Sequence, residues 1–245
     1  MMRDAHLLPV AILAGGMATR LRPATDRLPK ALIDVNGRPF IAWQLEALRA
    51  QGASRVIICV GYLGEDIRRV VADEQDIGLN VSWAFDGPTL LGTAGAICRA
   101  LPLIGGPFFV LYGDSYLPID WSPVQEAFLT SGKPGLMTVY QNEGHLDRSN
   151  VEFDGQHIVA YDKHAATSRM HHIDYGLGAF HPSAFDRLVD GRPADLADLY
   201  RDLAAERLLA AYEVHERFFE IGSFAGLEET RAYLASRPGQ EEGRP

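Results

Sequence analysis

Cysteine, long apolar runs and positive charge are all scarce in this chain of 245 residues. The two cysteines, Cys59 and Cys98, have no metal-site spacing and each falls in an apolar or helical pattern. We therefore expect small buried thiols in a reducing compartment and no disulfide framework. The apolar run at 7–13 contains Pro9 and is too short to cross a bilayer. These absences predict a cytoplasmic location and no membrane partner.

The charge balance argues against nucleic acid as a partner. The chain has 23 basic and 32 acidic residues, which give a formal net charge of −9 at pH 7. A surface of that sign does not attract nucleic acid, although a local basic pocket is compatible with it. Hydrophobic residues make up 47% of the chain, enough for the core of one large domain, which we expect at 1–235. The polar segment 236–245 is predicted to be a mobile tail.

Apolar runs of strand length alternate with segments of helical spacing in the first half of the chain. Strands are predicted at 10–13, 56–60, 81–85 and 108–111, and helices at 41–49, 65–71 and 94–101. This alternation is typical of βαβ units in a mainly parallel sheet. Ligands of such sheets bind beyond the carboxyl ends of the strands, so function should cluster after the first and fourth runs.

The second half predicts a small antiparallel extension of the sheet. Strands are expected at 136–140, 150–153, 157–161 and 173–180, with Asp154-Gly155 as a hairpin turn. A helix at 196–207, a strand at 210–214 and a last helix at 224–235 complete the pattern. The predicted fold class is α/β, a Rossmann-like three-layer sandwich with a mainly parallel central sheet.

A glycine-rich segment follows the first strand, with the sequence Ala14-Gly15-Gly16-Met17-Ala18-Thr19-Arg20-Leu21. Two glycines let backbone N–H groups approach an anion closely. Arg20 adds a planar fork of donors and Lys30 a compact charge, so the segment predicts a triphosphate cradle. A simple strand-to-helix turn explains the two glycines alone equally well. The Walker and dinucleotide-binding spacings are both absent.

Three segments in order carry a family resemblance: Leu13-Ala14-Gly15-Gly16-Met17-Ala18-Thr19-Arg20-Leu21-Arg22-Pro23, Leu28-Pro29-Lys30-Ala31-Leu32 and Asn36-Gly37-Arg38-Pro39. They resemble the sugar-1-phosphate nucleotidyltransferases, most closely the single-domain heptose- and hexose-1-phosphate guanylyltransferases. The resemblance implies the nucleotide-diphospho-sugar transferase fold and transfer from GTP to a heptose or hexose 1-phosphate. Ala18 departs from the family, which usually has glycine there.

The nucleotide site is expected to combine the glycine-rich segment with the stretch from Leu90 to Ala96. The resemblance assigns phosphate contacts to Leu13, Ala14, Gly15, Gly16, Met17, Ala18 and Thr19, and base or ribose contacts to Gly92 and Thr93. An ordinary helix start with Thr93 as its cap is the alternative. Asp86 can accept hydrogen bonds from a guanine edge, but a turn role is equally consistent with its position.

Two carboxylates are candidates for a Mg²⁺ site. Asp114 follows the fourth strand, where a carboxylate can reach the glycine-rich segment, and the resemblance assigns it to metal. The segment Phe218-Phe219-Glu220-Ile221-Gly222 resembles a late family element in which an Asp is the second ligand. Glu220 takes that place and adds one methylene. An ordinary solvated glutamate is the alternative for Glu220.

The resemblance places the sugar phosphate in the second half. Asn150, Asp162, Tyr175 and Gly176 are the expected sugar contacts, and Lys163 is expected to neutralise the attacking phosphate. Arg20, Lys30 and Lys163 are thus the predicted catalytic cations. An isolated lysine is usually a solvated surface residue, so Lys163 depends on its place in the series.

Other hypotheses remain open from the residues alone. The glycine-rich segment also occurs in nucleotidyltransferases with non-sugar phosphorylated acceptors, which is one alternative. A catalytically silent regulator that binds a nucleotide-sugar is another, and it is supported by the departures at Ala18 and Glu220. No serine or cysteine has an arguable His-and-acid partner set, so a covalent nucleophile is not indicated. Homo-oligomers are compatible with the sequence, with Phe218-Phe219 as an interface candidate if that pair is not core.

Overall fold

The computed structural model describes residues 7–16, 28–61, 63–74, 77–142 and 148–237. Four of the predicted nucleotide-site residues, Met17, Ala18, Thr19 and Arg20, lie outside the described residues. So does the predicted tail from residue 238 onward, whereas Ser236 and Arg237 are described directly after the last helix.

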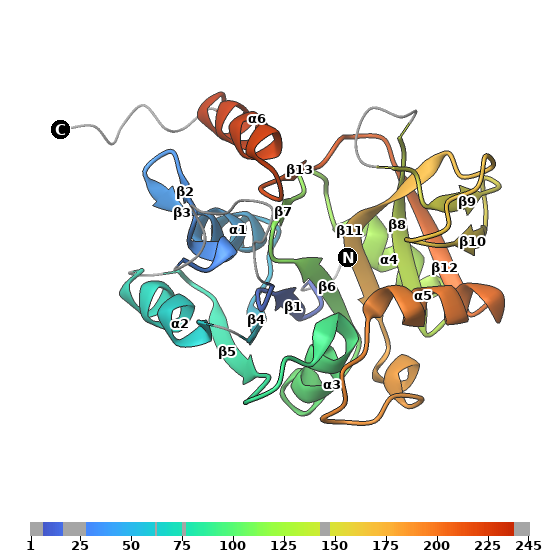
Figure 1. The fold of residues 1–245 in the computed structure, drawn as a ribbon, viewed down its shortest axis with the longest axis horizontal. Coiled ribbons are helices and arrows are strands. Elements are labelled where there is room, and N and C mark those ends of the chain that lie inside the picture. Colours follow the sequence, from blue (N-terminus) through green and yellow to red (C-terminus); the bar gives the residue numbers. More distant parts are fainter. Residues whose placement is uncertain (1–6, 17–27, 62, 75–76, 143–147, 238–245) are drawn as a thin grey trace, which may run out of the picture.

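Four parallel strands form the first part of the main sheet (Figure 1). β1 (Val10–Leu13) lies between β4 (Arg55–Val60) and β6 (Phe108–Tyr112), and β5 (Asn80–Phe85) pairs with the outer edge of β4. β1 is almost entirely buried on both faces, which is why it reads as an unbroken apolar run and not as an alternating one. The predicted parallel sheet is confirmed.

Helices cover both faces of this sheet, and the alternation along the strands decides which residues meet them. Val10 and Ile12 belong to a core cluster with residues of α1 (Phe40–Ala50), α2 (Gly64–Asp73) and α4 (Ser122–Ser131). Ala11 points the other way, into a second cluster with α3 (Gly92–Ile104) and α5 (Leu196–Ala205). The arrangement is the predicted three-layer sandwich.

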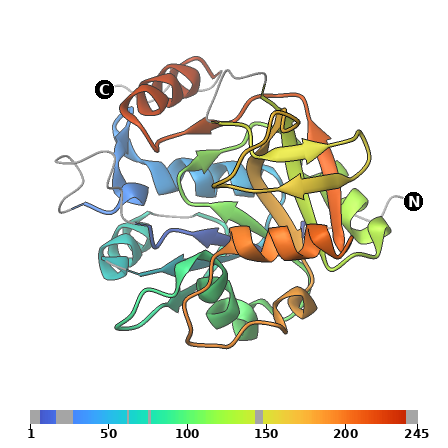
Figure 2. The ribbon, with the colours of Figure 1, turned by 45° about the vertical axis from the view of Figure 1, so that its right-hand side comes forward.

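The antiparallel extension is also confirmed. β11 (His172–Phe180) pairs antiparallel with β6 on one side and with β8 (Gly135–Gln141) on the other. β12 (Leu209–Val214) adds to β8 in parallel. β9 (Val151–Phe153) and β10 (Ile158–Tyr161) form a hairpin, which lies with α5 on the right in Figures 1 and 2. Gly155, in the predicted turn between them, has a φ of +96°.

Short elements carry parts of the site and have no sequence pattern of their own. They are the 3₁₀ helices η2 (Lys30–Leu32) and η3 (Pro182–Phe185), the hairpin of β2 (Asp34–Val35) with β3 (Arg38–Pro39), and the ribbon of β7 (Ser115–Tyr116) with β13 (Phe219–Glu220). α4 was not predicted either. Its buried face is Val124, Gln125 and Phe128, and the glutamine interrupts the apolar spacing.

Of the aromatic pair considered as an interface, Phe218 belongs to the core and Phe219 is partly buried against it. Phe218 is 8% exposed and meets Tyr175 edge to face, with ring centroids 5.6 Å apart. Phe219 stacks on Tyr233 of α6 (Phe224–Ala235) at 4.0 Å. Phe218 is therefore a core residue and not an interface candidate, whereas Phe219 is only partly buried.

Cys59 and Cys98 are both free and buried, as expected. Among the described helices, none has the length and apolar character needed to cross a bilayer.

At Gly113, directly after β6, the backbone passes close to the backbone at the end of β1. A Cβ added at Gly113 would lie 2.5 Å from the Leu13 carbonyl oxygen and 2.9 Å from the Ala14 Cα, which are backbone atoms that cannot move aside. We expect Gly113→Ala to destabilise the fold by about 2 kcal/mol through overpacking, measured by chemical denaturation. Gly106→Ala is the matched control, because a Cβ there meets no atom within 4 Å. Equal stability of the two variants would contradict the close approach.

Candidate active site

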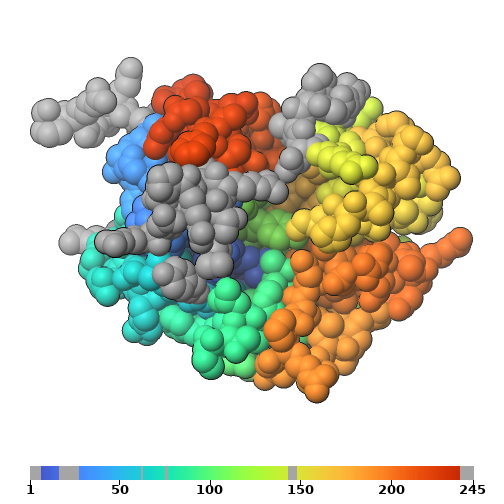
Figure 3. Space-filling model, in the orientation of Figure 1, coloured from blue at the N-terminus to red at the C-terminus, as the bar shows by residue number. Residues whose placement is uncertain are grey.

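A pocket of about 410 Å³ opens at the carboxyl ends of β1, β4 and β6. Figure 3 shows a hollow on this face between the green α3 region and the yellow and orange residues of the antiparallel extension. The pocket lining brings together predicted residues of four groups. They come from the glycine-rich segment, the segment at 86–93 (the base loop), the predicted metal site, and the side on which the sugar phosphate is expected (the acceptor side). These residues are Leu13, Ala14, Gly15, Gly16, Lys30, Asp86, Gly92, Thr93, Asp114 and Lys163.

The glycine-rich segment begins where β1 ends, fixed by backbone hydrogen bonds to both neighbouring strands. The Ala14 N–H donates to the Cys59 carbonyl at 2.9 Å, and the Gly113 N–H donates to the Leu13 carbonyl at 3.1 Å. A Cβ at Gly15 would lie 2.9 Å from the Gly61 nitrogen, so glycine is needed there for close passage. At Gly16 a Cβ would meet nothing within 4 Å. The close approach of backbone to backbone thus explains the glycine at position 15, whereas no contact with the described residues requires one at position 16.

An ion pair joins two charged groups of the pocket, Lys30 and Asp114. The Lys30 Nζ lies 2.6 Å from the Asp114 Oδ2, with side chains 17% and 32% exposed. Gln44 of α1 fixes the turn that carries Asp114, since its side-chain amide donates to the Tyr112 and Ser115 carbonyls at 3.1 and 2.8 Å. Asp114 is therefore held by its backbone as well as by Lys30.

Glu220 reaches the same place from the other strand of the short ribbon. β13 pairs antiparallel with β7, with Glu220 opposite Ser115, and the Ile221 N–H donates to the Asp114 carbonyl at 3.0 Å. A Cβ at Gly222 would lie 3.2 Å from both Glu220 carboxylate oxygens and 3.2 Å from the Lys30 Nζ. Lys30, Asp114 and Glu220 thus form one cluster around Gly222.

The base loop is closed by Asp86. Its Oδ2 accepts a hydrogen bond from the Leu91 N–H at 3.0 Å, and its side chain also lines the pocket. Burial raises the pKa of Asp86, although the Leu91 N–H and the Arg99 charge act against this. Asp86 therefore closes a turn and lines the pocket at the same time, although the sequence alone offered these two roles as alternatives.

Gly92 and Thr93 are both shaped by a segment far along the chain. Gly92 has a φ of +69°, and a Cβ there would lie 2.6 Å from the Ala194 carbonyl oxygen. The Thr93 hydroxyl donates to Asp195 at 2.9 Å and accepts from the Leu196 N–H at 2.7 Å. The N-cap of α3 is Leu91 and makes no side-chain hydrogen bond, so Thr93 is not the cap of this helix.

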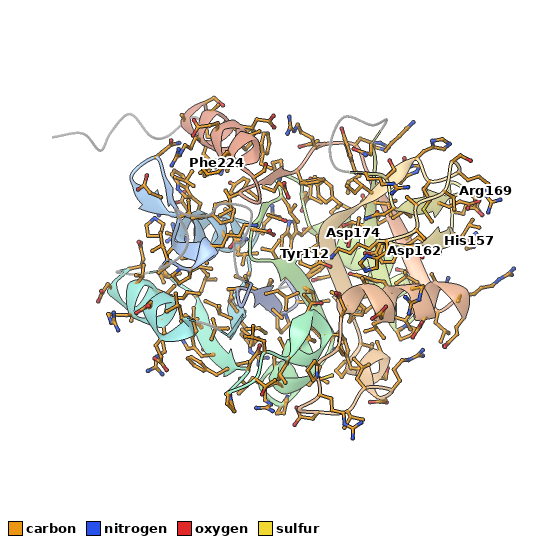
Figure 4. The ribbon with its side chains drawn as sticks, in the orientation of Figure 1. Tyr112, His157, Asp162, Arg169, Asp174 and Phe224 are labelled. Atoms are coloured by element: carbon orange, nitrogen blue, oxygen red, sulfur yellow. The ribbon has the colours of Figure 1, made fainter. Side chains whose placement is uncertain are left out.

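On the acceptor side, Asp174 contacts the pocket through Tyr112, as Figure 4 shows near the centre of the view. The Tyr112 hydroxyl donates to Asp174, whose backbone N–H donates to Asn150 Oδ1 at 3.1 Å. Burial raises the pKa of Asp174 to about 6, and the Gly176 N–H, the Lys163 charge and the Tyr112 hydroxyl counteract only part of that rise.

The remaining predicted sugar residues lie beside the pocket lining and not in it. Asp162 Oδ1 accepts from the His164 and Ala165 N–H groups, both at 2.7 Å, which lowers the pKa of Asp162 and closes the turn after β10. The Tyr175 side chain is buried in the core. Gly176 has a φ of +94°, with its Cβ position 3.3 Å from Ser115 Oγ.

Residues 10–216 match the family model of the MobA-like NTP transferase domain. The chain belongs to this family of nucleotidyltransferases. It is 30% identical over 227 residues to the N-acetylmuramate alpha-1-phosphate uridylyltransferase of Neisseria meningitidis serogroup B, covering 90% of this chain and 96% of that protein. It is 29% identical over 218 residues to the mannose-1-phosphate guanylyltransferase catalytic subunit beta of Xenopus tropicalis, covering 86% of this chain and 60% of that protein.

A solved structure shares the fold of this nucleotidyltransferase. HddC from Yersinia pseudotuberculosis, complexed with GMP-PN, superposes with a TM-score of 0.78 at 21% identity, over 93% of this chain and all of that one. The predicted fold class and the predicted enzyme class, sugar-1-phosphate nucleotidyltransferase, are both confirmed.

Sequence reasoning missed several residues at the site of the nucleotidyltransferase. Tyr112 and Cys59 line the pocket, and Asp174 and Asp195 contact residues that do. Tyr112 directly precedes the Gly113-Asp114 pair, which was a usable signal. Asp174 directly precedes the predicted sugar contact Tyr175, but it is Asp174 that hydrogen-bonds the pocket residue Tyr112, while the Tyr175 side chain is buried in the core.

The raised pKa of Asp174 predicts a pH-dependent effect on stability. Because its pKa is about 6 when folded and near 3.8 when unfolded, stability is lost as pH rises through this interval. Asp174→Asn should therefore gain thermal stability over the native enzyme, by an amount that grows from pH 4 to pH 6.5 and then levels off. Melting temperatures across this range measure the gain.

The exposed Asp154 is the control for that series. Backbone donors at His157 and Gln156 lower its pKa, so Asp154→Asn should show a deficit that stays constant above pH 5. If the difference in melting temperature between Asp174→Asn and the native enzyme were also constant with pH, the pKa of the Asp174 carboxyl would not be raised in the folded state.

Proposed function

We propose that the enzyme transfers a nucleoside monophosphate from GTP or UTP to a hexose- or heptose-type sugar 1-phosphate, giving an NDP-sugar and pyrophosphate. The supporting observation is the common pocket of Lys30, Asp114 and Lys163, which lies directly beyond Gly15 and Gly16. The relatives from Neisseria and Xenopus are named for transfer to sugar 1-phosphates. A cradle for phosphates that faces a second cation suits two anionic reactants.

The reaction needs alignment and charge neutralisation more than a protein nucleophile. A phosphate oxygen of the sugar 1-phosphate forms a bond to the α-phosphorus, and the bond from that phosphorus to the β-phosphate oxygen breaks. The electron pair of the broken bond leaves with pyrophosphate. Lys163 holds the attacking phosphate, while Lys30 and Arg20 neutralise the triphosphate. The backbone N–H groups of the glycine-rich segment orient the triphosphate for in-line attack.

Asp114 and Glu220 are the residues that would hold Mg²⁺. Their donor set fits the ion, since magnesium in such sites takes one or two carboxylates and completes its shell with water and substrate phosphates. Lys30 pairs with the Asp114 carboxylate, and the Glu220 carboxylate lies beside the same cluster at Gly222, so both oxygen donors are close to one place. Bound there, Mg²⁺ would offset the negative charge of the phosphates.

Loss of Glu220 should weaken metal binding before it affects the fold. We expect Glu220→Gln to raise the dissociation constant for Mn²⁺, measured by calorimetry in the presence of a non-hydrolysable NTP, by roughly tenfold. Glu228→Gln on α6 is the control, because Glu228 is exposed and pairs only with Arg231 among the described residues. Unchanged Mn²⁺ affinity in Glu220→Gln would remove Glu220 from the metal site.

The choice of base rests on Asp86. A carboxylate facing a base accepts hydrogen bonds from the N1–H and amino group of guanine or from the N3–H of uracil. The corresponding ring nitrogens of adenine and cytosine are acceptors and would be repelled. The base pocket therefore favours GTP and UTP over ATP and CTP.

A substrate matrix tests the proposal directly. Pyrophosphate release with Mg²⁺ is measured for four NTPs against a panel of hexose, N-acetylhexosamine-type and heptose 1-phosphates. We expect activity with GTP or UTP and one class of sugar, and a loss of at least roughly a hundredfold in Asp114→Asn. Silence with every sugar, alongside NTP binding, would instead favour a non-sugar acceptor or a nucleotide-binding regulator.

A further inference from the structure

Asp195 lies where two helices begin. It is the N-cap of α5, and its Oδ1 accepts the Ala197 N–H at 2.9 Å. The same oxygen accepts the hydroxyl of Thr93, the second residue of α3, also at 2.9 Å. Thr93 in turn accepts the Leu196 N–H. One carboxylate oxygen therefore connects the nucleotide pocket to a helix about a hundred residues further along the chain.

The backbone next to Asp195 reinforces this connection. The Ala194 carbonyl accepts the Ala94 and Gly95 N–H groups at 3.0 and 3.3 Å, and the Ala194 N–H donates to the Leu91 carbonyl at 2.9 Å. The first N–H groups of a helix otherwise lack partners, so residue 194 satisfies the start of α3 in place of a side-chain cap. The base loop has its shape because the segment at 192–196 lies against it.

Asp195 is also linked to the Lys163 side of the pocket, because its hydrogen-bond partner Thr93 lines the same pocket as Lys163. Burial raises the pKa of Asp195, but the Ala197 N–H, the Thr93 hydroxyl and the charges of Lys163 and His164 lower it further, and the net shift is downward. Lys163 also lowers the pKa of Asp174 on β11. The Lys163 ammonium thus lies within electrostatic reach of two carboxylates that come from different elements.

We propose that Asp195 is a positioning residue that joins the two half-sites, holding Thr93 beside the nucleotide by a hydrogen bond and orienting the Lys163 ammonium toward the acceptor phosphate by its charge. This inference rests on the proposed transfer to a sugar 1-phosphate. It assigns two separable tasks to one carboxylate, because the hydrogen bond needs only an oxygen and the orientation needs the negative charge.

The two tasks separate in Asp195→Asn. Asparagine is as good an N-cap as aspartate and keeps a side-chain oxygen for Thr93 and Ala197, but it removes the charge. We expect the KM for the sugar 1-phosphate to rise roughly tenfold while the NTP dissociation constant and the melting temperature stay near the native values. If the carboxylate only repelled the phosphate, the same variant would instead lower that KM.

Thr93 tests the other half of the link. Thr93→Val removes the hydroxyl while keeping the side-chain shape, and should weaken NTP binding measured by calorimetry by roughly tenfold. Thr93→Ser retains the hydroxyl and should restore binding.

Asp198→Asn is the matched control. Asp198 lies in the first turn of the same helix α5 and pairs with Arg201 at 2.7 Å, so its loss removes the same charge from the same helix end without touching Thr93. Its kinetic constants should equal the native ones. Equal effects of Asp195→Asn and Asp198→Asn, or an unchanged KM in Asp195→Asn, would overturn the positioning role. The native enzyme is assayed first, since its silence with all sugar phosphates would overturn the proposed function together with this inference.

Discussion

The parallel pairing of β1 with β4 and β6 is the constraint on which the site depends. Parallel strands end at the same edge, so the backbone after Leu13 lies between the ends of its two neighbours. The hydrogen bonds Ala14 to Cys59 and Gly113 to Leu13 continue this pairing past the ends of the strands. As a result, the glycine-rich segment and Asp114 lie side by side although about a hundred residues separate them.

Charge has to be brought to this edge from elsewhere, because the strands themselves are apolar. Lys30 comes from η2, which follows the glycine-rich segment, and Lys163 comes from the connection between β10 and β11. A chain with a net charge of −9 therefore lines one pocket with two cations, Lys30 and Lys163. Local placement of charge, and not the net charge, decides what the pocket attracts.

The sequence predicted those parts of the structure that have a period or a local motif. Long strands and helices were found because their apolar spacing is visible within the element, and Asp114 because it follows a buried strand. The two-residue strands β7 and β13 have no period, and they exist only because Glu220 pairs opposite Ser115 across a hundred residues. Asp195 was missed for the same reason, since its partner Thr93 is distant in sequence. In β11, Asp174 contacts the pocket residue Tyr112 while Tyr175 packs in the core, and this partner of Asp174 is distant in sequence as well.

Glu220 illustrates how a departure from a family pattern can be absorbed by its surroundings. A glutamate is one methylene longer than the aspartate usual at this place, so its carboxylate needs additional room. The ribbon fixes its backbone, since the Thr230 hydroxyl donates to the Glu220 carbonyl at 3.0 Å and the Ile221 N–H donates to Asp114. The side chain then reaches over Gly222, where a Cβ would lie 3.2 Å from both carboxylate oxygens. The absence of a side chain at Gly222 therefore gives the longer carboxylate its space beside Lys30, and the two positions have to be considered as one unit of the proposed metal site.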